Sequence, residues 1–121
     1  MTKRYIRHAA ELVTCKGPAP RRGREMADIG LIKDGGVLIH DDRIYAVGTT
    51  DELDSMIDPA EYEIIDASGK YIIPGVIDEH VHFNDPGTTF REDFEHGTAA
   101  CAVGGITTAI AMPTNTPLVL S

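Results

Sequence analysis

The sequence predicts an α/β protein in which a β-rich segment precedes the start of an α/β domain. Two β-rich runs flank the acidic turn formers Asp41 and Asp42, as in a hairpin. The composition then changes at Pro74-Gly75. A strand, a helix and an apolar strand follow in that order, which predicts a right-handed βαβ unit with parallel strands. We therefore expect two parts, residues 1–74 and residues 75–121.

The β-rich part should begin with one or two short strands over residues 5–14. Ile6, Leu12 and Val13 are its expected buried side chains. Residues 16–27 are polar and contain several Gly and Pro residues, so they are expected to form a loop. The hairpin strands are expected over 36–40 and 43–48.

A short helix and a second pair of strands complete the expected β-rich part. Thr49 is followed three residues later by Glu52, the spacing of a capping box, which predicts a helix over 51–57. Residues 63–66 and 71–73 are rich in Ile and Tyr and are predicted to pair with each other through the connection at 67–70.

The α/β part has three expected elements. Residues 76–82 form a strand, and a sharp loop follows at 84–87. Apolar and small residues then recur at helical spacing over 90–103, including Phe90, Phe94 and Cys101. Gly104-Gly105 should end this helix. Residues 106–112 are apolar on both faces, as in a strand that helices cover.

Composition excludes several classes of function. The chain has 11 basic and 19 acidic residues, so it offers no basic face for nucleic acid or an anionic membrane. Cys15 and Cys101 form neither a disulfide framework nor a zinc motif, which fits a reducing compartment. No apolar run approaches the ~18 residues of a membrane span, and no signal-like segment follows Met1. We expect a cytoplasmic protein.

His80 and His82 are the candidate metal ligands. They are separated by one residue on a predicted strand, so both imidazoles should point to the same side. Neutral imidazole binds Zn²⁺ and similar ions well, although a pair of this kind also occurs on solvated strands. Asp78 shares this face and should bind a neighbouring backbone group or orient a histidine ring. The isolated histidines are expected in the surface or core: His8, His40 and His96.

The stretch Pro74-Gly-Val-Ile-Asp-Glu-His-Val-His82 resembles the first barrel strand of the amidohydrolase superfamily. The motifs that follow are similar to its cyclic amidase branch of allantoinases, hydantoinases (dihydropyrimidinases) and dihydroorotases: Asn84-Asp-Pro-Gly87, Phe94-Glu-His-Gly-Thr98, Ala102-Val-Gly-Gly-Ile-Thr-Thr108 and Met112-Pro-Thr-Asn115. The resemblance covers about residues 71–117. It implies the start of a (β/α)₈ TIM-type barrel after a β-sandwich segment.

This resemblance implies metal-assisted hydrolysis of the C–N bond of a small cyclic amide, with one or two divalent ions, usually zinc. His80 and His82 would be the first ligands. The expected catalytic aspartate lies beyond Ser121, so no catalytic residue is assigned here. A barrel needs about 250 residues, so we expect the N-terminal piece of a longer, homo-oligomeric enzyme that is inactive as this chain alone.

Two asparagines are the candidate substrate-binding residues. Dihydroorotases typically place an arginine two residues after the second histidine and read Met-Pro-Asn, whereas this chain has Asn84 and Met112-Pro-Thr-Asn115. Asparagine can hydrogen-bond a ureide or imide but cannot make a bidentate ionic contact with a carboxylate. We therefore rank an allantoin- or hydantoin-like ring above dihydroorotate.

Other interpretations stay open. Within residues 10–48, several stretches resemble imidazolonepropionase, a member of the same superfamily: Leu12-Val-Thr14, Gly17-Pro18, Arg22-Gly23, 32–39 and 43–48. A non-catalytic amidohydrolase-like scaffold and an independent β-rich binding module are the two non-enzymatic alternatives.

Overall fold

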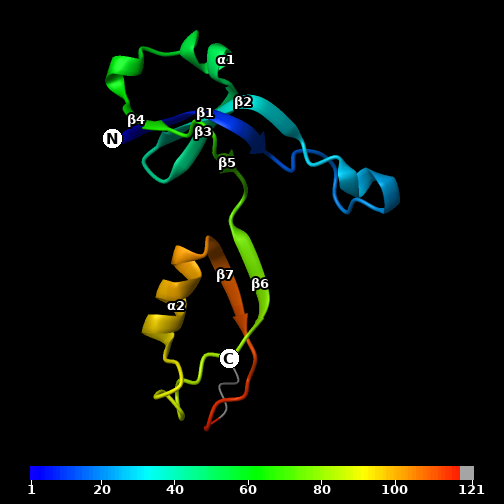
Figure 1. Cartoon of the computed structure of the whole chain (residues 1–121), viewed down its shortest axis with the longest axis vertical. Helices are drawn as coiled ribbons and strands as arrows, with labels where there is room; N and C mark the ends of the chain where they lie inside the picture. Colours follow the sequence, from blue (N-terminus) through cyan, green and yellow to red (C-terminus); the bar gives the residue numbers. More distant parts are fainter. Residues whose placement is uncertain (118–121) are drawn as a thin grey trace. The chain divides into compact units, whose positions relative to one another are not determined.

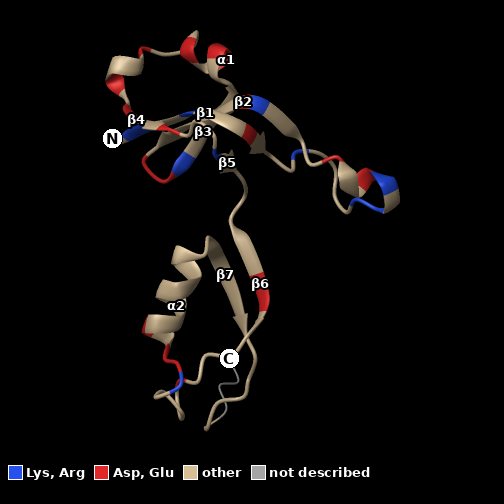
Figure 2. Cartoon of the chain, viewed as in Figure 1, with Lys and Arg blue, Asp and Glu red and all other residues tan. Residues whose placement is uncertain are grey.

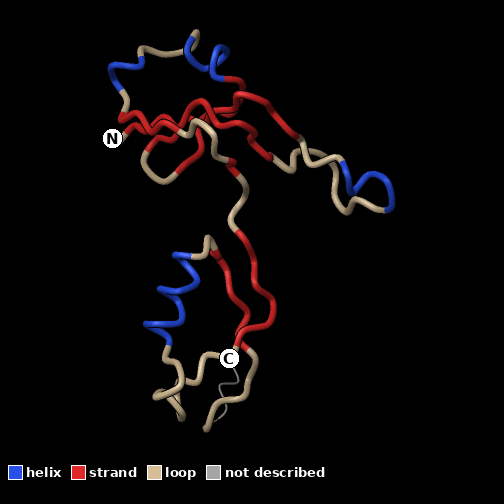
Figure 3. The backbone as a smooth tube through the Cα atoms, in the orientation of Figure 1, coloured by secondary structure: helices blue, strands red, loops and turns tan. Residues whose placement is uncertain are grey.

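The structure, a computed structural model, describes residues 1–117 and has two compact units, Met1–Pro74 and the residues from Gly75 onward. The first unit contains a five-stranded sheet with one α-helix, and the second contains two parallel strands joined by a helix (Figures 1 and 3). Among the described residues, no helix has the length and apolar character needed to span a membrane.

The sheet of the first unit has the order β3-β2-β1-β4, and β5 also pairs with β1. Its strands are β1 (Lys3–Val13), β2 (Leu31–His40), β3 (Arg43–Thr49), β4 (Glu63–Asp66) and β5 (Tyr71–Ile72). The predicted hairpin is confirmed, because β2 and β3 are antiparallel and His40 pairs with Arg43 across the acidic turn. The loop between β1 and β2 contains a short 3₁₀ helix, η1 (Gly23–Ala27).

The predicted pairing of residues 63–66 with 71–73 is wrong. Both β4 and β5 run parallel to β1, which is one continuous strand of 11 residues, and β4 and β5 pair with different parts of it. Between them, the turn at 67–70 is tied to β1 by Ala67 N–H to the Arg7 carbonyl and Ala10 N–H to the Lys70 carbonyl, both at 2.9 Å. The chain therefore continues along β1 after the turn instead of folding back on itself.

Helix α1 (Thr50–Asp54) covers one face of this sheet. Leu53 of the helix packs with Tyr5 and Leu38, and all three side chains are buried. Leu12 is buried as predicted. Ile6 and Val13 are only half-buried, because they line an open apolar groove of the sheet together with residues such as Val37, Ile39 and Val47.

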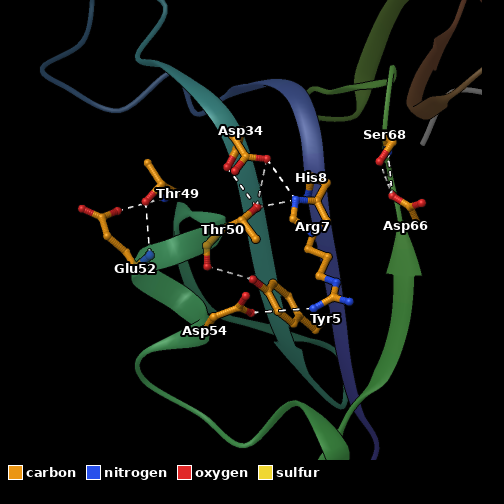
Figure 4. A network of polar contacts seen from close by, with 10 residues as sticks. All are labelled: Tyr5, Arg7, His8, Asp34, Thr49, Thr50, Glu52, Asp54, Asp66 and Ser68. Atoms are coloured by element: carbon orange, nitrogen blue, oxygen red, sulfur yellow. Dashed lines mark hydrogen bonds and ion pairs between the residues drawn. The ribbon is translucent and has the colours of Figure 1, made fainter.

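The capping box that the sequence predicts is present at the start of α1. Glu52 N–H donates to Thr49 Oγ1 at 3.2 Å, and Thr49 N–H donates to Glu52 Oε2 at 2.9 Å (Figure 4). The helix ends at Asp54, three residues earlier than expected. The Ser55 hydroxyl donates to the Glu52 carbonyl at 2.6 Å, which satisfies an acceptor left open at the helix end. The 3₁₀ helix η2 (Pro59–Glu61) follows.

The second unit is the predicted βαβ arrangement. Strands β6 (Val76–Val81) and β7 (Ile106–Ala111) are parallel, and α2 (Phe94–Val103) connects them. The helix starts four residues later than predicted, because Asp93 caps it by accepting a hydrogen bond from His96 N–H at 2.7 Å. This backbone hydrogen bond lowers the pKa of Asp93. Phe90 therefore lies in the preceding loop and is exposed.

Candidate metal centre

His80 and His82 meet at the carboxyl end of β6. His80 belongs to the strand and His82 is the first residue after Val81, where the strand ends. Their ring centroids are 5.1 Å apart and the two rings are nearly perpendicular, with both side chains exposed. Phe83 instead is buried and contacts Phe94 of α2, with ring centroids 5.2 Å apart. Side chains therefore alternate as predicted, with the two imidazoles close together and Phe83 against the helix.

Asp78 supports the histidine pair through the backbone. Its Oδ1 accepts a hydrogen bond from His80 N–H at 3.0 Å. The expectation that Asp78 binds a neighbouring backbone group is thus confirmed. In the described residues its carboxylate makes no hydrogen bond to a histidine ring, so it does not orient the imidazoles in this structure.

The segment after β7 makes three hydrogen bonds at His82 or at the residues next to it. Met112 N–H donates to the Val81 carbonyl at 2.8 Å, just before His82. The Asn115 amide donates to the Phe83 carbonyl at 2.8 Å, just after it. The ring itself is engaged through Nδ1, which lies 3.1 Å from Thr114 Oγ1. The position and orientation of His82 are therefore set jointly by the ends of two neighbouring strands.

Asn115, a predicted substrate-binding residue, is buried and holds the loop. Its Nδ2 also donates to the Asp85 carbonyl at 2.7 Å, so both amide hydrogens bind backbone oxygens of the loop after β6. Asn115 thus joins the loops that follow β6 and β7. Its amide nitrogen has no hydrogen left to donate to a substrate.

Asn84, the other predicted substrate-binding residue, lines a polar hollow beside His82. The hollow is about 540 Å³ in volume, and its walls are polar side chains from the two strand-end loops: His82, Asn84, Thr88, Arg91, Thr114 and Thr116. Asn84 makes only long contacts, from its Nδ2 to the His82 carbonyl at 3.4 Å and from the Thr88 hydroxyl to its Oδ1 at 3.3 Å. Its amide can therefore turn towards a bound molecule at little cost.

Among the described residues, Arg91 is the only permanently charged side chain in the wall of the polar hollow. Its guanidinium lies 6.0 Å from the centroid of the Phe90 ring and has no ion pair with any of residues 1–117. Figure 2 shows acidic residues on β6 and no charged residue on β7. The hollow therefore combines the His82 imidazole with one guanidinium and uncharged hydroxyl and amide groups, a set that suits a small polar or anionic molecule, and the His80 ring lies next to that of His82.

Sequence reasoning did not identify Arg91 or Thr114. The helical spacing from Phe90 onward predicts that Arg91 lies in a helix, but Asp93 caps α2 and leaves Arg91 in the preceding loop. Thr114 stood within the Met-Pro-Thr-Asn run, but only the folded chain brings it to the His82 ring.

Several known proteins are similar to this chain in sequence. A family model described as dihydro-orotase-like matches residues 69–118. A dihydroorotase of Clostridioides difficile is 48% identical over 84 residues, which are 69% of this chain and 18% of that protein. An imidazolonepropionase of Parabacteroides distasonis is 44% identical over 82 residues, 68% of this chain and 20% of that protein. The chain spans about a fifth of the length of these curated relatives.

Solved structures agree with the sequence comparisons. A D-hydantoinase superposes with a TM-score of 0.63 at 31% identity, covering 91% of this chain and 20% of its own. An enamidase of the amidohydrolase superfamily superposes with a TM-score of 0.60 at 24% identity, and the match covers 91% of this chain and 25% of the enamidase chain. At this identity the likeness shows the fold alone. The predicted fold class is confirmed: a β-rich segment followed by the opening βαβ unit of a TIM-type barrel, with its sheet not closed.

Proposed function

We propose that this chain, which belongs to the amidohydrolase superfamily and resembles its cyclic amidase branch, supplies part of the active site of a hydrolase acting on a cyclic amide. The bond that is cleaved is the C–N bond of the ring. The observation that carries the proposal is the His80–His82 pair at the carboxyl end of β6, beside the polar hollow. Enzymes built on parallel α/β barrels keep their chemistry at this end of the strands.

The donor atoms fit a divalent metal ion, and zinc is the ion we propose. Two imidazole rings with centroids 5.1 Å apart can present nitrogens to one ion at the usual Zn–N distance of about 2.0–2.1 Å. Residues 1–117 contain no group of three or more His, Cys, Asp or Glu side chains that could hold an ion. His80 and His82 would therefore be two ligands of a site completed by other residues. A bound ion would lower the pKa of a water molecule and polarise the substrate carbonyl.

The chain's own residues would bind and position the substrate next to the ion. Asn84, with its weakly held amide, would hydrogen-bond the ring amide, and the Thr88 hydroxyl would add a second polar contact. The loops that carry these side chains are fixed by the Asn115 tether to the Phe83 and Asp85 carbonyls. A rigid surround of this kind keeps a substrate carbonyl in a reactive orientation at low entropic cost.

An uncharged ureide or imide ring, as in allantoin or a hydantoin, is the substrate class that Asn84 favours. Dihydroorotate is the second candidate, and a specific observation supports it. Arg91 lies in the wall of the same hollow as Asn84 and can bind a carboxylate, the contact that an asparagine cannot make. Similar proteins from Clostridioides difficile and Lactobacillus helveticus are dihydroorotases, and the D-hydantoinase is a structural neighbour.

Chimeric enzymes test the proposal. This chain would replace the matching segment of the Clostridioides difficile dihydroorotase, and in a second chimera that of the D-hydantoinase. We expect metal-dependent hydrolysis of the host's substrate in at least one chimera, lost in His80→Ala and His82→Ala. The chimera that retains the larger share of its host's kcat/KM identifies the closer substrate class. If both chimeras fold but neither has activity, the chain is a non-catalytic scaffold and the proposal is wrong.

The 121-residue chain itself should bind zinc weakly and show no turnover. Two histidines supply fewer ligands than the three or four protein ligands of tight zinc sites. Zinc titration of the chain and of His80→Ala and His82→Ala should show weaker binding in both variants. His96→Ala is the matched control, because His96 is exposed and its ring contacts Asp93 instead of the pair. Equal zinc affinity in all four proteins would show that His80 and His82 do not bind the ion.

A further inference from the structure

Thr114 and His82 form the one hydrogen bond that reaches either ring of the histidine pair in the described part of the chain. The bond joins His82 Nδ1 to Thr114 Oγ1 at 3.1 Å. Thr114 comes from the segment after β7, 32 residues along the chain from His82. The ring of His80 has no such partner among residues 1–117, although the two rings are neighbours.

The backbone of Thr114 is held in place by its neighbours. Thr114 N–H donates to the Met112 carbonyl at 2.8 Å, which makes a tight turn after β7. Met112 N–H is in turn bonded to the Val81 carbonyl, and the next residue, Asn115, is buried and bonded to the Phe83 carbonyl. The residues before and after His82 are thus bonded to Met112 and Asn115, which lie on either side of Pro113 and Thr114 in the chain. The backbone that carries Thr114 is therefore held beside His82, within reach of the imidazole.

A neutral imidazole carries its proton on one nitrogen and offers a lone pair on the other. The Thr114 hydroxyl can accept from Nδ1–H or donate to an Nδ1 lone pair, and only the first arrangement leaves the Nε2 lone pair free for a metal ion. We propose that Thr114 is a positioning residue: its Oγ1 accepts a hydrogen bond from Nδ1–H of His82 and so directs the Nε2 lone pair towards the metal ion. This proposal rests on the proposed function for the identity of the ligand, a divalent cation. Among residues 1–117 the His80 ring has no such partner, so we expect it to sample both tautomers in the metal-free chain.

The consequence for metal binding follows from the same bond. A ligand ring that is already in the correct tautomer and orientation loses less freedom when the ion binds. Removal of a hydrogen-bond partner of a ligating histidine typically weakens metal affinity about 10- to 100-fold. A hydroxyl is an uncharged acceptor, so we expect an effect near the lower end, about tenfold.

Nitrogen-15 NMR of the metal-free 121-residue chain tests the proposal directly, because long-range proton–nitrogen correlations distinguish the two tautomers of each histidine. The measurement is made above about pH 8, where histidine is neutral. We expect His82 in the Nδ1–H form and His80 as a mixture. In Thr114→Val, which has the same shape without the hydroxyl, His82 should become a mixture like His80. Thr114→Ser should restore the Nδ1–H form.

Zinc titration gives the second readout. Thr114→Val should bind Zn²⁺ about tenfold more weakly than the original chain, and Thr114→Ser should match it. The proposal is overturned if His82 of the original chain carries its proton on Nε2, or if Thr114→Val keeps the Nδ1–H form. Failure of the proposed function would give a different result. His82→Ala would then leave zinc affinity unchanged, while in the chain that retains His82 the tautomer of its ring would still depend on Thr114.

Discussion

Phe83 and Gly97 are in such close contact that Gly97 has no room for a side chain. A Cβ atom at Gly97 would lie 2.6 Å from Cδ1 and Cε1 of the buried Phe83 ring. Phe83 follows His82 directly, and Gly97 lies on the face of α2 that contacts the Phe83 ring. The missing side chain therefore lets the helix approach the strand end that carries the histidine pair.

Gly97→Ala should destabilise the second unit. The added methyl group must displace the Phe83 ring, and overpacking of this kind costs about 1–3 kcal/mol, against a gain of about 1 kcal/mol from the higher helix propensity of alanine. Gly104→Ala is the matched control, since a Cβ there meets no atom closer than 3.5 Å. Urea unfolding should give a lower free energy of unfolding for Gly97→Ala than for Gly104→Ala. Equal values would show that Phe83 moves aside freely.

Asn115→Ala should loosen both strand-end loops. It removes the donor from the Phe83 and Asp85 carbonyls, and loss of a buried hydrogen-bond partner costs about 1–3 kcal/mol. Asn84→Ala is the control. The hydrogen bonds of the Asn84 side chain are long, so its removal should cost little stability. Amide hydrogen exchange of residues 82–88 should accelerate in Asn115→Ala alone. Similar exchange in the two variants would mean that the loops are held by other contacts.

Arg91→Gln should separate the two substrate candidates. If the hollow binds a carboxylate, the dihydroorotase chimera should lose affinity for dihydroorotate, with KM raised about tenfold for the lost charged hydrogen bonds. Arg91→Lys should recover part of this loss, because it keeps the charge but not the bidentate geometry. Hydrolysis of an uncharged hydantoin by the other chimera should not change. Steady-state kinetics with both substrates checks this, and an equal loss in both would assign Arg91 to the structure of the loop.

Tyr5 should make the first unit sensitive to alkali. Burial, and next the neighbouring Asp54 carboxylate, raise the pKa of Tyr5 to about 12 from its ordinary value of 10.0. Because the folded state holds this proton more tightly, the corresponding stability is complete below about pH 10 and is lost as the pH rises through about 12. Unfolding measured over this range should show the loss in the original chain, and ultraviolet absorbance should show one tyrosine ionising last.

Tyr5→Phe should remove most of this alkaline dependence. It also deletes the hydrogen bond from the Tyr5 hydroxyl to the Thr50 carbonyl, 3.2 Å long, at a cost of about 1 kcal/mol at neutral pH. Tyr71→Phe is the control, because the Tyr71 side chain is exposed. If the alkaline loss of stability persists in Tyr5→Phe, another group is responsible.

Features that depend on residues close together in the chain can be predicted from the sequence. The acidic turn between β2 and β3, the Thr49–Glu52 capping box and the βαβ order all follow from local patterns. The proximity of His80 and His82 belongs to this group, because side chains two apart on a strand share a face whatever surrounds the strand.

Which distant segments meet depends on the packing of the folded chain. Nothing local to residues 63–72 specifies that β4 and β5 both pair with β1, because that choice depends on the length of β1 and on the turn bonded to Arg7 and Ala10. In the same way, Thr114 reaches His82 and Arg91 enters the polar hollow only because parallel strands bring their carboxyl ends to one edge. A hydrogen bond across 32 residues leaves no periodic pattern in the sequence, so only the folded chain reveals it.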